Sequence, residues 1–242
     1  YKLENGLSVV AEQMEAVQSV AVSVLLPFGA ANDPTGFEGQ ASIVAEMFNK
    51  GAGSWNAREL SQQFEDIGVE RSISTGVEAT AFSAALLPEN LARALEIIGI
   101  VLLQPKFPSE ELDSVAQLAL QDLLALEDSP ASKAMVELAR LYYPYPWGAS
   151  QLGTQEGIKA VTGDSIWSFY REHVVPSNAI IGIAGKFQWD EIEKSIQQIF
   201  SGWRGSRDRL VYPSCPLENK ESYIHKESSQ SHLALAYPSV SL

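Results

Sequence analysis

The spacing of hydrophobic side chains switches along this chain, from every second residue to every third or fourth and back again. Between Val20 and Leu26 apolar residues alternate with others, and the run ends at Pro27, which is typical of a half-buried strand. The same rule predicts further strand patterns at 2–11 (a hairpin around Asn5-Gly6), 69–75, 78–87 and 178–185.

The helical period fills the stretches between these strands. Pro88 opens a strongly amphipathic run, Asn56 with Glu59 forms a capping box, and Ser109 is expected to cap a long helix. The expected helices cover 36–50, 56–68, 88–102, 109–127, 129–142, 164–173 and 189–200. Because strands and helices are partly segregated, we predict an α+β fold, a two-layer sandwich with helices packed on one mostly antiparallel sheet.

Composition limits the classes of partner. The chain has 242 residues, enough to bury a core without crosslinks, and its net charge of −13 argues against nucleic acid and anionic membrane surfaces. Cys215 is the single cysteine, so we expect an inert thiol and no internal disulfide. No apolar run reaches the length of a membrane span, so we expect a soluble chain with no membrane insertion. A targeting segment could precede Tyr1, which leaves the compartment open.

The composition changes near residue 202, where Arg, Ser, Pro and Gly become frequent. Two strand-like runs follow, at 221–226 and 232–237, and they are too short to form a domain by themselves. We predict one α+β domain over residues 1–205. Residues 206–242 are then a linker and the first strands of a second, mostly absent domain.

Several short motifs occur in the same order and at similar spacing as in one enzyme family. They are Leu3-Glu4-Asn5-Gly6-Leu7, Phe48-Asn49-Lys50-Gly51-Ala52, Pro105 to Phe107 and Pro176-Ser177-Asn178. On these the chain resembles the insulinase/pitrilysin zinc metallopeptidases (inverzincins), including the mitochondrial processing peptidases. The resemblance runs from residue 1 to about residue 237.

Members of that family bind zinc through H-x-x-E-H on a helix and a glutamate on a later helix. Two histidines four residues apart share one helix face and one metal, and the glutamate between them is the general base. The resemblance places the histidines on Ser42 and Glu46, the base on Ala45 and the later glutamate on Val115. A neighbouring family carboxylate falls on Asp122. We therefore expect a homologue without catalytic residues or a zinc cofactor of its own.

Other polar residues allow functional and ordinary interpretations. Glu46 could bind a cation, although a hydrogen-bonded carboxylate is the simpler interpretation. His173 lies near a helix end, where a charged imidazole is favourable, and capping or packing is preferred to metal binding. His225 and His232 could meet across a hairpin and hold a metal, which is the less favoured alternative. No histidine is placed beside Ser42 to activate it as a nucleophile.

The resemblance also marks a candidate peptide-binding strand. Ser72, Ile73, Ser74 and Thr75 match the strand that pairs with substrate backbone in the family. Pairing of this kind needs only main-chain groups, so it could survive loss of the metal. An edge strand with no ligand is an equally plausible interpretation.

The leading functional hypothesis is an inactive subunit that works with an active, zinc-bearing homologue in the proteolysis of peptides, as a heterodimer or by self-association. In the family an Arg/Tyr pair belongs to the second domain, which residues 1–242 mostly do not include. One alternative is a structural core subunit like those of the respiratory cytochrome b–c complex, with no protease role. An active enzyme with a different site is a third and weaker alternative.

Overall fold

The computed structural model describes residues 1–208, 210–211, 220–227 and 230–238. Its centre is a five-stranded sheet in the order β1-β7-β2-β6-β5. The strands are β1 (Ser8–Gln13), β2 (Val20–Leu26), β5 (Glu70–Thr75), β6 (Thr80–Leu86) and β7 (Ile180–Gly185). The pair β1–β7 is parallel and the other three pairs are antiparallel, which confirms the mostly antiparallel sheet. A ladder of two-residue strands, β3 (Gly51–Ala52) and β4 (Trp55–Asn56), stands apart.

Eight α-helices surround the sheet in the described part of the chain. They are α1 (Gln40–Met47), α2 (Ala57–Glu65), α3 (Leu91–Leu103), α4 (Ser109–Glu127), α5 (Pro130–Tyr142), α6 (Gln155–Ala160), α7 (Gly163–His173) and α8 (Trp189–Phe200). Short 3-10 turns precede or follow them at η1 (Ala30–Asn32), η2 (Phe48–Lys50) and η3 (Pro88–Asn90). None of these helices is long and apolar enough to cross a bilayer, as far as the described residues reach.

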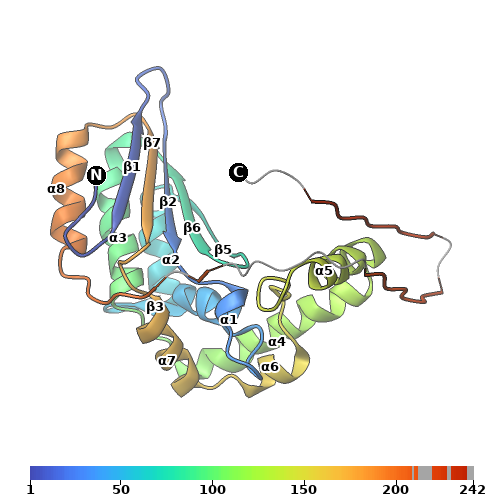
Figure 1. Cartoon of the computed structure of the whole chain (residues 1–242). Helices are drawn as coiled ribbons and strands as arrows, with labels where there is room; N and C mark the ends of the chain where they lie inside the picture. Colours follow the sequence, from blue (N-terminus) through green and yellow to red (C-terminus); the bar gives the residue numbers. More distant parts are fainter. Residues whose placement is uncertain (209, 212–219, 228–229, 239–242) are drawn as a thin grey trace.

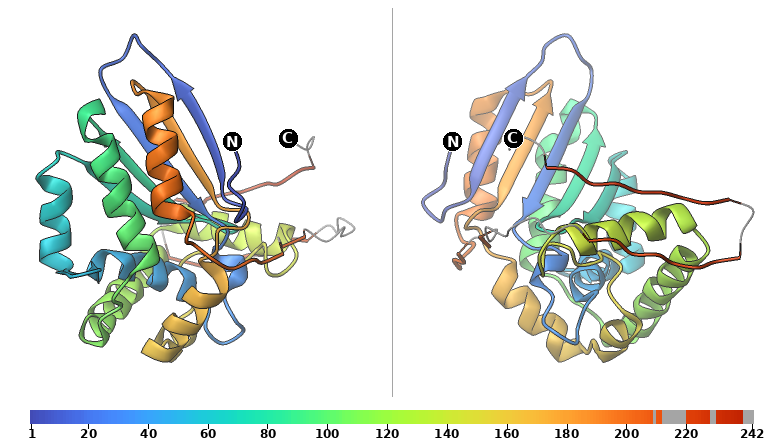
Figure 2. Two further views of the ribbon diagram at one scale, coloured as in Figure 1. Left: turned by 90° about the vertical axis from the view of Figure 1, so that its left-hand side faces the viewer. Right: turned by 45° about the vertical axis from the view of Figure 1, so that its right-hand side comes forward.

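The layers follow from which side chains are apolar. Helices α3 and α8 lie against one face of the sheet, while α1 and α4 to α7 gather beyond its lower end (Figures 1 and 2). The buried face of β2 meets Leu95 and Ile98 of α3 and Ile196 of α8, all fully buried. Gly99 lets α3 and α8 approach closely, since a Cβ there would lie 2.3 Å from Cγ2 of Ile199. The arrangement is the predicted α+β sandwich.

The N-terminal hairpin forms as predicted. Gly6 turns the chain with φ +94°, and Lys2 forms an antiparallel bridge with Ser8. The Asn5 side-chain amide donates to the carbonyls of Phe200 and Trp203, at 2.7 and 3.1 Å. The hairpin therefore adds a hydrogen bond to the last carbonyl of α8, which also accepts from the backbone N–H of Trp203 at 3.0 Å.

Three expectations for the helices were wrong in detail. The helix predicted for 36–50 begins only at Gln40, because Gly36 and Gly39 have φ +85° and +105°. Ser109 does not cap α4, whose N-cap is Pro108 with no side-chain hydrogen bond. Helix α6 was missed, although Thr154 caps it by accepting from the backbone N–H of Gly157 at 3.0 Å.

The region after α8 differs from the prediction as well. The described residues within 221–226 and 232–237 are extended but join no ladder, so the two expected strands are not formed there. Cys215 and most of the predicted linker lie outside the described residues.

Candidate functional site

Helix α1 carries the positions that the metallopeptidase resemblance singles out. The carboxylate of Asp33, which precedes the helix, caps its N-terminus. Asp33, only 7% exposed, accepts hydrogen bonds of 2.7 Å from the backbone N–H groups of Gly39 and Ala41. These two donors would otherwise be unpaired at the start of the helix. Burial raises the pKa of Asp33 to about 6, and the two backbone hydrogen bonds oppose that shift.

Ser42, on the first turn of α1, is engaged in a structural contact. Its hydroxyl donates to the backbone carbonyl of Gln151 at 2.8 Å, in the loop between α5 and α6. The same loop approaches Glu38 closely, since a Cβ on Gly153 would lie 2.2 Å from the Glu38 carbonyl oxygen. Ser42 therefore fastens this loop to α1.

Ala45 and Val115 are parts of the packing between helices. Ala45 is 3% exposed and Val115 is 2% exposed, on the helices α1 and α4 that contact one another. Val115 belongs to the main hydrophobic core. Neither side chain offers a donor atom or a proton-accepting group.

Glu46, one turn beyond Ser42, is paired within its own helix and the turn that follows it. Its carboxylate accepts from Asn49 Nδ2 at 3.3 Å and lies 3.8 Å from Lys50 Nζ. Its charge also raises the pKa of Arg71, against the lowering caused by burial of that guanidinium. The structure thus presents Glu46 as a hydrogen-bonded, ion-paired carboxylate.

Zinc chemistry needs three protein ligands directed at one point. The four positions supply one hydroxyl and one carboxylate, each already partnered, and two alkyl groups. Over the described ranges, with their gaps at 209, 212–219 and 228–229, no three His, Cys, Asp or Glu side chains gather as a metal would require. The residues present do not fit the family's zinc ion. Asp122 of α4 is exposed.

The histidines lie apart from α1. His173 is buried, its Nδ1 lies 3.0 Å from the carbonyl of Phe169, and its ring stacks on the Phe169 ring at 4.0 Å. Burial, and then the charge of Arg207, lower the pKa of His173 to about 4. Burial and the stacked Phe169 ring agree with the preferred interpretation of His173 as a packing residue, and the lowered pKa disfavours a charged imidazole there. His225 and His232 are exposed.

The candidate peptide-binding strand β5 is an edge strand. It pairs with β6 on one side, and its other side makes no backbone hydrogen bond within the described chain. Ser72 and Ser74 are exposed on the open sheet face, and Ile73 and Thr75 are half-buried on the other face. The predicted residues therefore lie at an accessible edge of the sheet.

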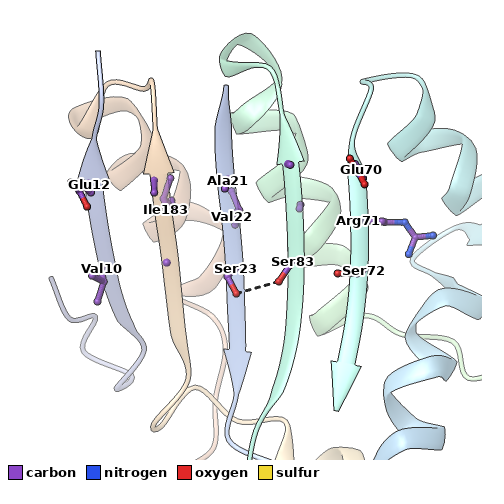
Figure 3. A pocket seen from close by; sticks show the side chains of 14 residues that line it. Val10, Glu12, Ala21, Val22, Ser23, Glu70, Arg71, Ser72, Ser83 and Ile183 are labelled. Carbon is purple, nitrogen blue, oxygen red and sulfur yellow. Dashed lines mark hydrogen bonds between the residues drawn. The ribbon is translucent and has the colours of Figure 1, made fainter. Parts of the chain in front are cut away.

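The open face itself was not anticipated as a feature. A hollow of about 670 Å³ lies over all five strands, and small side chains form its floor (Figure 3). Ser23, Ser83 and Ser72 face each other across β2, β6 and β5, with 3.5 Å between the Oγ atoms of Ser23 and Ser83. The signal was present in the sequence, because Ala and Ser occupy the positions that alternate with the buried residues of β2 and β6.

Comparison with known proteins agrees with this geometry. Residues 8–145 match the family model described as "Insulinase (Peptidase family M16)", and residues 160–242 match "Peptidase M16 inactive domain". A Rickettsia bellii protein named "Uncharacterized zinc protease" is 28% identical over 99% of this chain and 58% of its own length.

Solved structures show the same fold. A Helicobacter pylori protease superposes with a TM-score of 0.79 at 20% identity, covering 90% of this chain and 53% of that one. A Pseudomonas fluorescens structure described as a peptidase M16 inactive domain gives 0.77 at 18% identity, covering 90% and 52%. The chain thus spans little more than half the length of each of these three proteins. Because the insulinase model alone matches more than half of the chain, this protein belongs to the insulinase family of peptidases, family M16.

Proposed function

We propose that this chain is a non-catalytic member of its family, which binds extended peptide on β5 and works beside a zinc-bearing homologue that cleaves it. The observation that carries the proposal is the use of the four motif positions. Ser42 holds a loop, Glu46 is ion-paired, and Ala45 and Val115 are buried in helix packing. In this proposal α1 keeps the form of a zinc-peptidase helix, while its polar side chains make structural contacts within the chain.

The peptide-binding part of the proposal relies on main-chain chemistry. An added strand needs free N–H and C=O groups along one edge, and Ser72, Ile73, Ser74 and Thr75 offer such an edge. This capacity does not depend on the lost ligands. It is what a subunit without a metal can still contribute to a peptidase.

The domain division supports a partner of the same fold. We propose residues 1–205 as one unit and 206–242 as a linker with the start of a second, homologous unit. The relatives are longer than this chain, and the match to the inactive-domain model continues to residue 242. The partner is then a homologous subunit, or a second copy of the same protein.

The first test measures zinc content and cleavage. The chain is purified without chelator, its zinc is measured by atomic absorption, and cleavage of unfolded casein is followed with and without EDTA. We expect neither stoichiometric zinc nor EDTA-sensitive cleavage. Both together in the isolated chain would refute the assignment.

The second test measures peptide binding. A short fluorescein-labelled peptide of alternating valine and lysine is titrated against the protein, beside an analogue methylated on every backbone nitrogen, so that neither edge of the peptide can donate. Methylation removes donors without changing the side chains, so edge-strand pairing predicts binding of the first peptide only. Equal binding of both peptides would contradict pairing with β5.

The third test identifies the partner by purification from the native source. A co-purifying homologue with an intact H-x-x-E-H helix supports the peptidase pair. Respiratory-complex subunits in its place would favour the structural role.

A further inference from the structure

We propose that Arg71 is a positioning residue, which fixes the edge strand β5 against α2 and against η2, the turn that follows α1, and so keeps the strand ready to pair with peptide. The inference rests on the proposed peptide binding at β5. It assigns to one side chain the task of ordering that edge.

Arg71 joins three elements through one guanidinium group. Nη1 donates to Oδ1 of Asn49 in η2, and Nη2 lies 3.5 Å from Oγ of Ser61 in α2. The guanidinium also stacks over the Phe64 ring of α2, 4.7 Å from its centroid. A single side chain of β5 therefore contacts both the turn that ends α1 and the helix that follows it.

The interactions continue into the former zinc helix. Asn49, which accepts from Arg71, donates to the carboxylate of Glu46, and Glu46 pairs with Lys50. Glu46 occupies one of the positions that the family uses for a metal ligand. The carboxylate at that position is thus connected, through Asn49, to the candidate peptide-binding strand.

Only arginine suits this place. The planar guanidinium donates in two directions and stacks on an aromatic ring at the same time, which an ammonium group cannot do. Burial lowers the pKa of Arg71, while the negative charges of Glu46 and Glu65 raise it. Both carboxylates favour the charged form that makes these contacts.

The tether that Arg71 makes uses its side chain alone. Glu70 and Ser72 face the open side, while the Arg71 side chain extends sideways from β5, on the side away from β6, and also lines the hollow (Figure 3). Its tether therefore uses no main-chain group of β5. An edge strand held by its side chain stays ordered and still offers its backbone, which lowers the entropy lost on binding.

The experiment compares Arg71→Met with the wild-type chain by hydrogen exchange and by titration of the valine–lysine peptide. Methionine keeps the length of the side chain but removes the charge and the donors. We expect amides in 70–75 to exchange roughly tenfold faster, while the β2–β7 ladder is unchanged. We expect about tenfold weaker peptide binding as the edge loses its order.

Arg93→Met is the matched control. Arg93 on α3 makes comparable contacts, to Glu96 at 3.0 Å, to Gln63 at 2.8 Å and over the Trp55 ring at 5.8 Å, but none to β5. Its replacement should leave both readouts unchanged. Arg71→Lys keeps the charge and loses the two-directional donation, so it should restore part of the exchange protection and part of the affinity.

Asn49→Ala separates the proposed path from a general loss of stability. If Arg71 acts through Asn49, the double variant should exchange no faster than Arg71→Met alone. Wild-type exchange and affinity in Arg71→Met would overturn the inference. If that variant fails to fold, wild-type exchange in Asn49→Ala would overturn it.

The two proposals can fail separately. If the wild-type chain does not bind the peptide, the proposed function fails, and the exchange of β5 alone decides the role of Arg71. If the wild-type chain binds and Arg71→Met binds equally well, the positioning role fails and peptide binding stands.

Discussion

The hydroxyl of Ser42 donates to the backbone carbonyl of Gln151 at 2.8 Å, and this bond joins α1 to a loop 109 residues further along the chain. The resemblance to the metallopeptidases assigns a metal-ligand position to Ser42. In this chain its hydroxyl bonds to a loop instead, and the contact contributes to the fold.

Replacing Ser42 by alanine should therefore cost stability. Loss of the donor leaves the Gln151 carbonyl without this partner, which is worth about 1 kcal/mol in the free energy of unfolding. Urea unfolding followed by circular dichroism measures the change. Ser114→Ala is the control, because that hydroxyl bonds at 2.8 Å to Glu111 within the exposed start of α4 and should cost little. Equal losses in the two variants would mean that the Ser42 bond has no special role.

Asp33 should give a pH dependence of unusual sign. Its pKa is raised to about 6 in the folded state, from 3.8, mainly by burial. Between these two values the folded chain binds the proton more tightly than the unfolded chain. The contribution of Asp33 to stability should thus rise as pH falls from above 6 toward 4. Comparing the free energy of unfolding of the wild type and Asp33→Asn at pH 7.5 and 5 isolates this contribution. If the wild type is less stable relative to the variant at pH 5 than at pH 7.5, the prediction is refuted.

His173 should show the opposite sign. Its pKa is lowered to about 4 in the folded state. Between pH 6.5 and 4 the unfolded chain therefore binds a proton at His173, whereas the folded chain does not. The contribution of His173 to stability should therefore fall as pH is lowered through that window. His173→Phe keeps an aromatic ring beside Phe169 and removes the titration, so its unfolding free energy should depend less on pH. An equal pH dependence in the two proteins would mean that His173 is not held neutral.

Residues 173 and 207 also show what the sequence could not reveal. Nε2 of His173 and Nη1 of Arg207 are both buried without a hydrogen-bond partner. The charge of Arg207 contributes to the lowered pKa of His173, after burial. The two residues are 34 positions apart in the sequence, and no local pattern indicates that they influence one another.

Local patterns explain why most of the fold was predictable. The strands follow from a period of two, and the Asn56–Glu59 capping box appears as expected, with bonds of 2.9 and 3.0 Å. Features that the helical period does not show account for the errors. The positive φ of Gly36 and Gly39 delays the start of α1, and α6 is only six residues long, too short for a clear apolar face.

Motif spacing predicted that Ser42, Ala45 and Glu46 share one helix and that Val115 lies on a second. The structure has them on α1 and α4, which contact one another. Their assignment to the family's ligand positions stays a prediction. What each side chain now does depends on Gln151, Asn49 and Arg71, which no motif connects to them. The open sheet face required the register of five strands, which periodicity alone does not provide.

The strongest test of the assigned positions is to rebuild the ligands. A variant with Ser42→His, Ala45→Glu, Glu46→His and Val115→Glu carries the family's full set on α1 and α4. If the positions are correct, the variant should bind zinc near one ion per chain, because two histidines a turn apart and a facing glutamate can share one metal. Burying two carboxylates at Ala45 and Val115 should destabilise the metal-free variant by about 3 kcal/mol, and zinc should recover part of that loss. The double variant Ser42→His with Glu46→His lacks the third ligand and should bind zinc at least about tenfold more weakly.

Competition against a chromogenic chelator gives the affinities, and circular dichroism shows whether each variant is folded. A folded quadruple variant that binds zinc no better than the wild type would show that α1 and α4 do not present these positions to a common point.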